Sequence, residues 1–306
     1  MTTDFFAEQA FDLVDRASFA GPEKLAFTVD VEEWFQVGAF ETTFSRTDWP
    51  KLESRVEVQT RALLDLLSNL DVTGTFFALG WVAERCPELI RQIVGAGHEL
   101  GCHGMDHRRL FTMQRAEFRD DIRKAKALLE QASGADVVGY RAPSFSLVPE
   151  VWWVYEELAA AGFKYSSSLY PVKTDHYGAS SAPRTPFFPL AGNDLVEIPM
   201  TVCDLPFRRV PASGGGYFRL LPYRLSVFLI RQGQNQAGVP GLFYMHPWEM
   251  DLGQPFVQEA PWLSKFRHYT GQKQLPAKLA KLARAFSWGR IDKIYENVLK
   301  PSDEGI

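Results

Sequence analysis

The chain has few cysteines, little net charge and no long apolar run, and each absence excludes a class of protein. Three cysteines among 306 residues form no disulfide framework, and their odd number suits a reducing compartment. A net charge of −4 provides no general attraction to nucleic acid or anionic membranes. No apolar run approaches the roughly 20 residues that span a bilayer, and residues 1–22 do not resemble a secretory signal. We therefore expect a cytoplasmic protein without a transmembrane segment or a nucleic-acid partner.

Most of the chain alternates between short apolar strands and amphipathic helices. A hydrophobic content of 46%, with 23 phenylalanines, is enough to fill a large core. Apolar, β-branched and aromatic runs predict strands at 25–31, 73–78, 98–101, 137–140, 164–166, 194–198 and 241–245. Apolar residues at helical spacing predict helices between these strands and two more helices over 272–299. This alternation is typical of parallel strands with helical crossovers, so we expect an α/β fold.

Two histidines, His103 and His107, stand four positions apart directly after the strand predicted at 98–101. Neutral imidazoles bind divalent transition metals well, and two at this spacing can converge on one ion. An isolated pair of this kind is more often two surface histidines near a turn, so a third ligand decides between these interpretations. The strand at 25–31 ends in carboxylates, and two histidines with one carboxylate form a common catalytic zinc site.

The expected third ligand is one of two adjacent glutamates, Glu32 and Glu33. Residues i and i+2 of a strand share a face, so Glu32 joins Asp30 in the pocket if the strand continues that far. Glu33 then points the other way, although a bulge at the strand end would reverse the assignment. We predict Glu32 as the ligand and keep Glu33 as the alternative.

Four residues with useful chemistry fall at or just after the carboxyl ends of predicted strands: Asp30, His103, Arg141 and His246. In α/β barrels this edge of the strands carries the active site. The agreement among four strand ends indicates a shared site more strongly than any single motif does. Residues 171–189, rich in proline, serine and tyrosine, predict a long loop over that site.

In their order along the chain, these motifs resemble the NodB-homology polysaccharide deacetylase family. The resemblance runs from about Lys24 to Asp251 through five motifs, at 28–32, 103–107, 141–145, 165–168 and 244–246. Residues 213–219 and 267–270 are similar to a bacterial subgroup associated with exopolysaccharide and exosortase loci. The resemblance implies a distorted (β/α) barrel of about seven parallel strands with extra C-terminal helices. It implies an N-terminal extension over 1–23, a catalytic barrel over 24–251 and a helical extension over 252–306 packed on the barrel.

Two positions depart from the family pattern. The first motif usually ends in adjacent aspartates, but Val31 occupies the second place, so Glu32 or Glu33 has to bind the metal instead. Some relatives that resemble peptidoglycan deacetylases share this wider spacing. The fourth motif commonly has an aspartate where Ser166 stands, which argues against a polar relay at that position.

The resemblance also implies roles for the strand-end residues. Glu32, His103 and His107 would hold a divalent metal, with zinc as the first choice and cobalt, nickel or iron as alternatives. Asp30, oriented by Arg141, would take a proton from the metal-activated water. His246 has the family position of the general acid that protonates the departing sugar amine.

Aromatic residues near these motifs predict a groove in which sugar rings stack. The candidates are Trp34, Phe145, Tyr217 and Trp248. The backbone N–H near Phe145 would join the metal in holding the oxyanion.

Three functions fit the pattern. The first is a metal-dependent N-deacetylase acting on a glycan, an N-acetylhexosamine-containing polysaccharide or its precursor. The second is a related amidohydrolase on a small amide, similar to allantoinases. The third is a catalytically degenerate glycan-binding protein, suggested by Val31 and Ser166. The sequence leaves the glycan, the metal and the oligomeric state open.

Overall fold

The computed structural model describes residues 5–8, 11–19, 21, 23–172 and 179–300. Its strands are β1 (Asp12–Leu13), β2 (Lys24–Val31), β3 (Thr75–Ala78), β4 (Glu99–Cys102), β5 (Gly139–Tyr140), β6 (Tyr165–Ser166), β7 (Phe187–Phe188), β8 (Val196–Glu197), β9 (Val202–Leu205), β10 (Arg208–Pro211), β11 (Gly241–Met245) and β12 (Ser287–Gly289). The main sheet has the order β1-β7-β8-β6-β5-β4-β3-β2-β11, and β12 also pairs with β2. The seven strands from β8 to β11 in this order are parallel, as predicted. At the other end of the order β7 and β1 pair antiparallel, and β9 and β10 form a separate hairpin.

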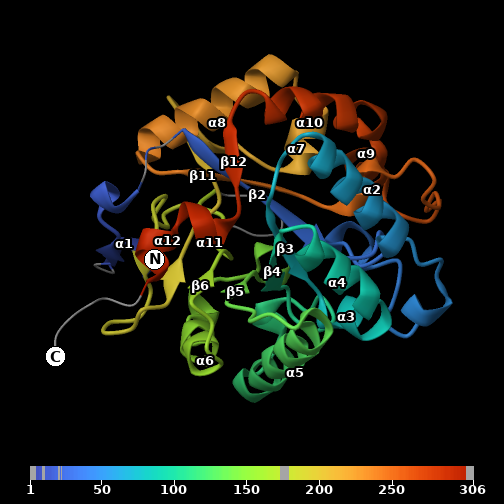
Figure 1. Ribbon diagram of the computed structural model, residues 1–306, viewed down its shortest axis with the longest axis horizontal. Coiled ribbons are helices and arrows are strands. Elements are labelled where there is room, and N and C mark those ends of the chain that lie inside the picture. Colours follow the sequence, from blue (N-terminus) through green and yellow to red (C-terminus); the bar gives the residue numbers. More distant parts are fainter. Residues whose placement is uncertain (1–4, 9–10, 20, 22, 173–178, 301–306) are drawn as a thin grey trace.

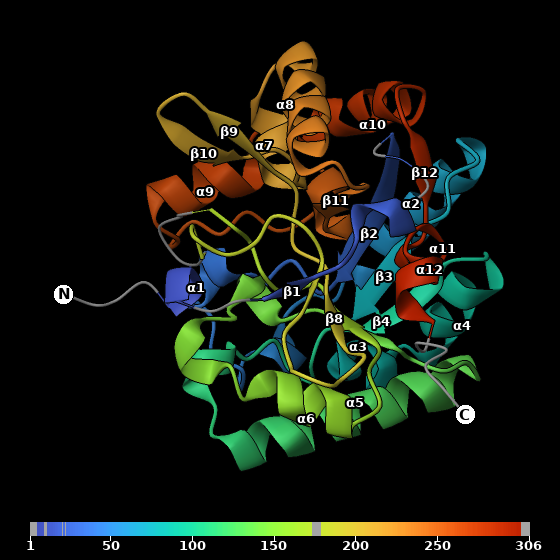
Figure 2. The same ribbon diagram turned by 90° about the vertical axis from the view of Figure 1, so that its left-hand side faces the viewer.

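Helices cover the strands from outside. They are α1 (Phe5–Glu8), α2 (Val56–Asn69), α3 (Gly80–Arg85), α4 (Pro87–Gly95), α5 (Arg115–Ser133), α6 (Val154–Ala160), α7 (Gly215–Leu220), α8 (Tyr223–Ala237), α9 (Trp262–Tyr269), α10 (Leu275–Ala283), α11 (Ile291–Ile294) and α12 (Glu296–Leu299). In both views α5 and α6 lie on one side of the strands, and α8 and α10 lie on the opposite side (Figures 1 and 2). Within the described residues, no helix combines the length and apolar content needed to cross a bilayer.

Strand β2 lies inside the sheet and is buried on both faces. Leu25, Phe27 and Val29 pack into one apolar cluster, whereas Ala26 packs into another on the opposite face. Burial on both faces is typical of a parallel strand covered by helices and explains why its sequence is nearly continuously apolar. Strand alternation places Asp30 on the Ala26 face. The Asp30 side chain, near the end of this apolar strand, therefore lies in the interior of the barrel.

The C-terminal residues are built into the barrel more closely than the sequence pattern predicts. The first helix expected in the tail is α10, but the second is broken into the one-turn helices α11 and α12. Between α10 and α11, the three residues of β12 pair in parallel with the start of β2 (Figure 1). At the start of α11, the backbone N–H of Ile291 donates to Thr75 Oγ1 at 2.8 Å. A strand of three residues is too short to produce a periodic signal, so sequence reasoning missed it.

The loop expected over 171–189 is described only in part, because 173–178 lie outside the described residues. Residues 187 and 188 form β7, whose pairing with β8 places this end of the segment in the main sheet.

Candidate active site

A pocket lies at the carboxyl ends of β2, β4 and β11. Its lining residues are Asp30, Glu32, Val37, Gly38, Ala39, His103, His107, Arg109, Ser144, Phe145, Gly216, Arg219, Tyr244, His246, Trp248, Glu249, Ser264, Arg267 and His268. His107, Ser144 and Phe145 have positive φ angles of 57°, 54° and 49°. Residues other than glycine rarely adopt positive φ angles, and those that do concentrate at functional sites.

Three side chains in this pocket could hold a metal ion. One ligand atom from each of Glu32, His103 and His107 lies within 4.8 Å of the others, and all three residues are buried. Glu32 Oε2 and His107 Nε2 are 2.8 Å apart. Apart from this contact, Glu32 Oε2 has no hydrogen-bond donor among the described residues. A buried carboxylate oxygen without a further hydrogen-bond donor fits a position where a cation binds.

The protonation states of this cluster also suit a cation. Burial lowers the pKa of His103 to about 4, so its ring is neutral at pH 7. The His103 Nδ1 atom lies 2.8 Å from the Arg141 carbonyl oxygen, to which it can donate, leaving Nε2 as the ligand atom. For Glu32, burial alone would raise the pKa, but the adjacent imidazoles, that of His107 above all, lower it to about 2. The carboxylate is therefore ionised and the His103 ring neutral, as metal ligands must be.

The turn between the two histidines is held from neighbouring elements. Gly104, at φ 79°, adopts a left-handed conformation that favours glycine. Its carbonyl accepts a hydrogen bond from the Gly80 N–H at 2.9 Å, at the start of α3. The N–H of Met105 donates to Asp121 Oδ2 at 2.9 Å, from α5. Helices α3 and α5 thus fix the loop on which His107 is presented.

Glu33 points away from the pocket toward the start of α2. Its carboxylate accepts hydrogen bonds from the Ser54 hydroxyl and from the Arg55 backbone N–H, the latter at 3.0 Å. Arg55 precedes the first residue of α2, so the carboxylate caps this helix from another part of the chain. The adjacent glutamates thus serve different neighbours, and the structure brings Glu32, not Glu33, to the histidines.

We predict that Glu32→Gln loses the bound metal, whereas Glu33→Gln keeps it. The second substitution weakens the contacts of Glu33 with Ser54 and Arg55, so it should lower the free energy of unfolding by about 1 kcal/mol. Elemental analysis of the purified variants and urea unfolding measure the two effects. Metal retained by Glu32→Gln but lost from Glu33→Gln would reverse the assignment.

Asp30 is held by the fully buried guanidinium of Arg141. Arg141 Nη1 donates to Asp30 Oδ1 and to Thr28 Oγ1, both at 2.8 Å. The same guanidinium donates to the backbone and side chain of Ser167 at 3.1 Å and lies 4.2 Å above the Phe77 ring. With Oδ1 engaged, Asp30 presents Oδ2 to His246, 4.0 Å from Nε2. Arg141 thus orients the carboxylate and balances its charge.

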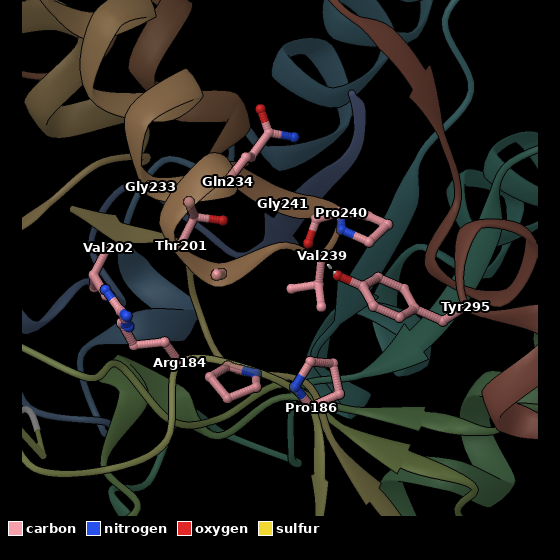
Figure 3. A pocket seen from close by; sticks show the side chains of 12 residues that line it. Arg184, Pro186, Thr201, Val202, Gly233, Gln234, Val239, Pro240, Gly241 and Tyr295 are labelled. Atoms are coloured by element: carbon pink, nitrogen blue, oxygen red, sulfur yellow. Dashed lines mark hydrogen bonds between the residues drawn. The ribbon is translucent and has the colours of Figure 1, made fainter. Parts of the chain in front are cut away.

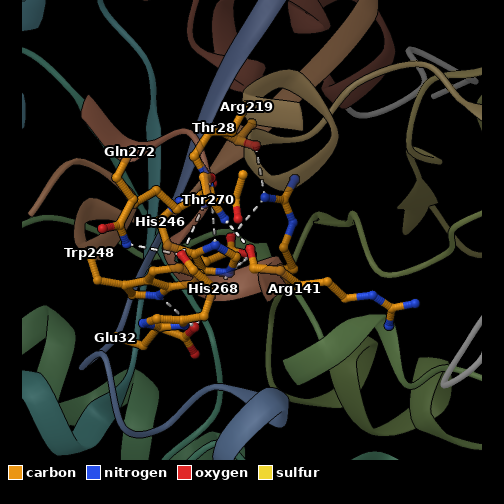
Figure 4. A network of polar contacts seen from close by, with 12 residues as sticks. Thr28, Glu32, Arg141, Arg219, His246, Trp248, His268, Thr270 and Gln272 are labelled. Atoms are coloured by element: carbon orange, nitrogen blue, oxygen red, sulfur yellow. Dashed lines mark hydrogen bonds and ion pairs between the residues drawn. The ribbon is translucent and has the colours of Figure 1, made fainter. Parts of the chain in front are cut away.

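His107 approaches Glu32 Oε2, whereas His246 approaches Oε1 of the same carboxylate. The His246 Nε2 atom lies 3.4 Å from Glu32 Oε1, and its Nδ1 atom lies 3.0 Å from Glu249 Oε1. Burial alone would lower the pKa of His246, but the hydrogen bond with Glu249 and the nearby Glu32 and Asp30 carboxylates raise it to about 9. Figure 4 shows the rings of His246, Trp248 and His268 grouped beside Glu32. A protonated imidazole at this position can donate a proton.

Two of the four residues expected to bind sugar lie elsewhere. Trp34 is only 2% exposed, donates through Nε1 to the Glu53 carbonyl at 2.9 Å, and packs among other aromatic rings. That prediction is corrected: the Trp34 indole belongs to the core. Tyr217 is half-buried on α7 and is not among the described residues that line the pocket, although Gly216 is. Phe145 and Trp248 do line it.

The Phe145 N–H also differs from the expectation. It donates to the Ala142 carbonyl at 3.1 Å, which closes a 3₁₀ turn over Pro143–Phe145. This hydrogen bond is internal to the turn, so the oxyanion contact expected near Phe145, which stays a prediction, would need a different N–H.

Sequence reasoning missed Glu249 and Arg219. Glu249 follows His246 by three residues, and this short spacing was the available signal. Arg219 lies 30 residues upstream of Glu249, with no local pattern to connect them.

A smaller hollow lies between the start of β11, the C-terminal end of α8 and Tyr295 (Figure 3). The Tyr295 hydroxyl donates to the Pro240 carbonyl at 2.7 Å. Arg184 is the charged residue among its lining, and it pairs with Asp204 at 2.5 Å. The Tyr295 and Arg184 side chains at this hollow therefore make contacts within the fold.

The fold and the pocket define an α/β barrel with a two-histidine, one-carboxylate cluster at the carboxyl ends of its strands. Residues 48–163 match the family described as polysaccharide deacetylase, and residues 167–296 match a domain of unknown function, DUF3473. The chain therefore contains a polysaccharide deacetylase domain of the NodB-homology type, and the predicted family resemblance is confirmed. The exopolysaccharide subgroup stays a prediction.

Several sequence relatives are bacterial deacetylases. The chain is 33% identical over 118 residues to a peptidoglycan deacetylase of Helicobacter pylori, covering 37% of this chain and 38% of that protein. It is 33% identical over 94 residues to a peptidoglycan-N-acetylglucosamine deacetylase of Bacillus cereus, covering 31% and 32%. It is 37% identical over 73 residues to a chitooligosaccharide deacetylase of a Bradyrhizobium species, covering 24% and 33%. The chain thus spans about a third of the length of each of these curated relatives.

One solved structure resembles almost the whole chain. It is a crystal structure from Mycobacterium smegmatis of a protein classed provisionally as a polysaccharide deacetylase. The two share 21% identity and a TM-score of 0.62, over 95% of this chain and 94% of that one. This likeness supports the fold, and the predicted barrel is confirmed.

Both matched segments contribute to the pocket. His103 and His107 belong to residues 48–163, whereas His246 belongs to residues 167–296. Asp30 and Glu32 precede both segments. The site is therefore assembled from three stretches of chain that are brought together by neighbouring parallel strands.

Proposed function

We propose that this protein is a metal-dependent N-deacetylase that hydrolyses acetamido groups of an N-acetylhexosamine-containing polysaccharide or its precursor. The observation that carries the proposal is one pocket with a metal-type cluster, an Arg141-held Asp30 and His246 within 4.0 Å of Asp30. These are the parts that amide hydrolysis needs: an activated water, a base and an acid for the departing amine. The names of the curated relatives support a glycan as the substrate.

Each group has a defined task in this reaction. A divalent metal bound by Glu32, His103 and His107 would supply Lewis acidity for the water and the acetyl carbonyl. Asp30 accepts a proton from the water through Oδ2, while Arg141 holds Oδ1. As the C–N bond breaks, His246 delivers a proton from Nε2 to the amine nitrogen. The products are acetate and a free amino sugar.

We further propose zinc as the metal, because two imidazoles and one carboxylate with an open position suit a catalytic zinc site. Cobalt, nickel or iron can take the same donors, so geometry and availability decide among them. A role in exopolysaccharide biosynthesis rests on the likeness of residues 213–219 and 267–270 to that subgroup.

The purified protein is expected to release acetate from N-acetylglucosamine oligomers. Chelation should abolish the release, and zinc should restore it, because the base and acid act on groups that the metal activates. Acetate quantified enzymatically, together with elemental analysis, measures both effects. Binding of the oligomers without acetate release would indicate a degenerate glycan-binding protein, and hydrolysis confined to small amides would indicate an amidohydrolase.

A further inference from the structure

We propose that the DUF3473 segment, residues 167–296, supplies the acid half of this site: Glu249, braced by Arg219, holds the His246 ring so that Nε2 faces the scissile bond. The inference rests on the proposed function and assigns a task to a segment that is described as a domain of unknown function. Glu249 and Arg219 are positioning residues, because they act through His246.

The first step is the contact between Glu249 and His246. Glu249 Oε1 lies 3.0 Å from His246 Nδ1 and accepts the His246 backbone N–H, also at 3.0 Å. One carboxylate oxygen thus binds both the ring and the backbone of the same residue. A hydrogen bond from Nδ1–H to a carboxylate fixes which ring nitrogen faces outward, here Nε2. This nitrogen lies 3.4 Å from Glu32 Oε1 and therefore faces the metal cluster.

The second step is the bracing of Glu249 by Arg219. Arg219 Nε donates to Glu249 Oε2 at 2.7 Å, and each of the two side chains is only 1% exposed. The other two guanidinium nitrogens of Arg219 donate to the backbone carbonyls of residues 267, 268 and 270, at the end of α9. Figure 4 draws Arg219 together with His268 and Thr270, whose carbonyls accept its hydrogen bonds. With all three nitrogens engaged, the guanidinium cannot rotate away, so the carboxylate has one position.

The third step concerns Gly214 and Gly215, which lie against β11 and Glu249. A Cβ atom on Gly215 would lie 2.2 Å from Glu249 Oε1, and a Cβ atom on Gly214 would lie 2.6 Å from the Tyr244 ring. Both positions therefore require glycine for Glu249 and β11 to approach this closely. Gly215 thus leaves space for the carboxylate, and Arg219, which braces that carboxylate, follows four residues later on α7.

The His246 ring is also held from its side. It stacks on Trp248 with centroids 4.9 Å apart, and Trp248 stacks on His268 at 4.2 Å. Trp248 Nε1 points to Glu32 Oε1 at 3.4 Å. His246, Trp248, His268, Glu249 and Arg219 all belong to the DUF3473 segment. The two histidines of the metal cluster belong to the preceding segment, and Glu32 precedes both segments, so the acid comes from a different segment than the proposed metal ligands.

The test is Glu249→Gln in the metal-loaded, full-length protein. Deacetylation of N-acetylglucosamine oligomers should fall about 100-fold or more, because general acid assistance is typically worth 10²–10⁴-fold. Hydrolysis of 4-nitrophenyl acetate should change little, because its leaving group departs without a proton. His246→Ala should likewise lose amide hydrolysis and keep ester hydrolysis. The double variant should hydrolyse the amide no more slowly than His246→Ala alone. Metal content per chain should stay unchanged.

Glu157→Gln is the matched control. Glu157 is also a buried carboxylate bound by arginine, with Arg115 Nε at 2.6 Å and Arg119 Nε at 2.7 Å, but it lies on α6 away from the pocket. It should retain both activities. Glu249→Asp keeps the charge beside Arg219 but withdraws the carboxylate from His246. Glu249→Asp should lose amide hydrolysis, but not ester hydrolysis, to a smaller degree. It replaces Glu249→Gln in the test if that variant does not fold.

Nitrogen NMR of the His246 ring tests the positioning without any activity. The resonances, identified by their absence in His246→Ala, should show hydrogen on Nδ1 in the native protein and a changed Nδ1 environment in Glu249→Gln. Equal losses on amide and ester, loss of metal, or unchanged amide turnover would overturn the inference. A native protein that releases no acetate from any glycan refutes the proposed function instead, and the NMR result still decides the positioning.

Discussion

Replacing His103 or His107 by alanine is expected to remove metal binding and the proposed deacetylase activity together, while the fold stays largely intact. Open catalytic metal sites contribute less to folding than closed structural sites do. Activity should fall by at least about 100-fold, since even loss of an outer partner of a metal ligand costs 10–100-fold. Elemental analysis, acetate release and thermal unfolding measure the three quantities.

His98→Ala is the control for this prediction. His98 is also buried beside a strand, but its Nδ1 accepts the Gly74 backbone N–H at 3.0 Å and its ring packs on Phe76. It does not line the pocket, so the variant should lose stability but keep its metal. Stoichiometric metal in the double variant His103→Ala, His107→Ala would refute the assigned site.

Asp30→Asn is expected to keep the metal and to lower amide turnover by about 10²–10⁴-fold, the usual worth of a general base. Asparagine can still accept the hydrogen bond from Arg141 Nη1, so the arginine keeps a partner. It cannot take the proton from the water. Single-turnover acetate release and metal analysis separate this loss from a loss of metal.

Thr28→Val provides the comparison for Asp30→Asn. Thr28 Oγ1 accepts from the same Arg141 Nη1 at 2.8 Å, but its hydroxyl has no part in the proton transfer. Its removal should cost far less turnover than Asp30→Asn does. Near-normal amide turnover in Asp30→Asn would mean that the base is another group.

The apolar and polar pattern along the chain was enough to predict parallel strands with helical crossovers and the edge where the site lies, whereas the barrel was implied by the family resemblance. Strand β2 is apolar on both faces and then ends in carboxylates, and this contrast alone indicates a buried strand with a functional end. The spacing of His103 and His107 likewise predicts convergence of the two rings, which the structure places in one cluster with Glu32. These signals are local, because side-chain direction repeats every two residues in a strand.

Only the tertiary structure decided which neighbours each side chain meets. Trp34 follows the motif closely, yet core packing and the Glu53 carbonyl hold it away from the pocket. Glu33 is chemically equal to Glu32, but the start of α2, more than 20 residues later, binds it.

The acid side of the site depends most on tertiary structure. Arg219 and Glu249 meet only because α7 and the turn after β11 pack together, and β12 reaches β2 across almost the whole chain. Sequence by itself determined the periodic elements, the strand ends and the types of chemical group available there. The folded chain decided which of those groups share a pocket, because contacts between residues far apart in the sequence leave no periodic trace in it.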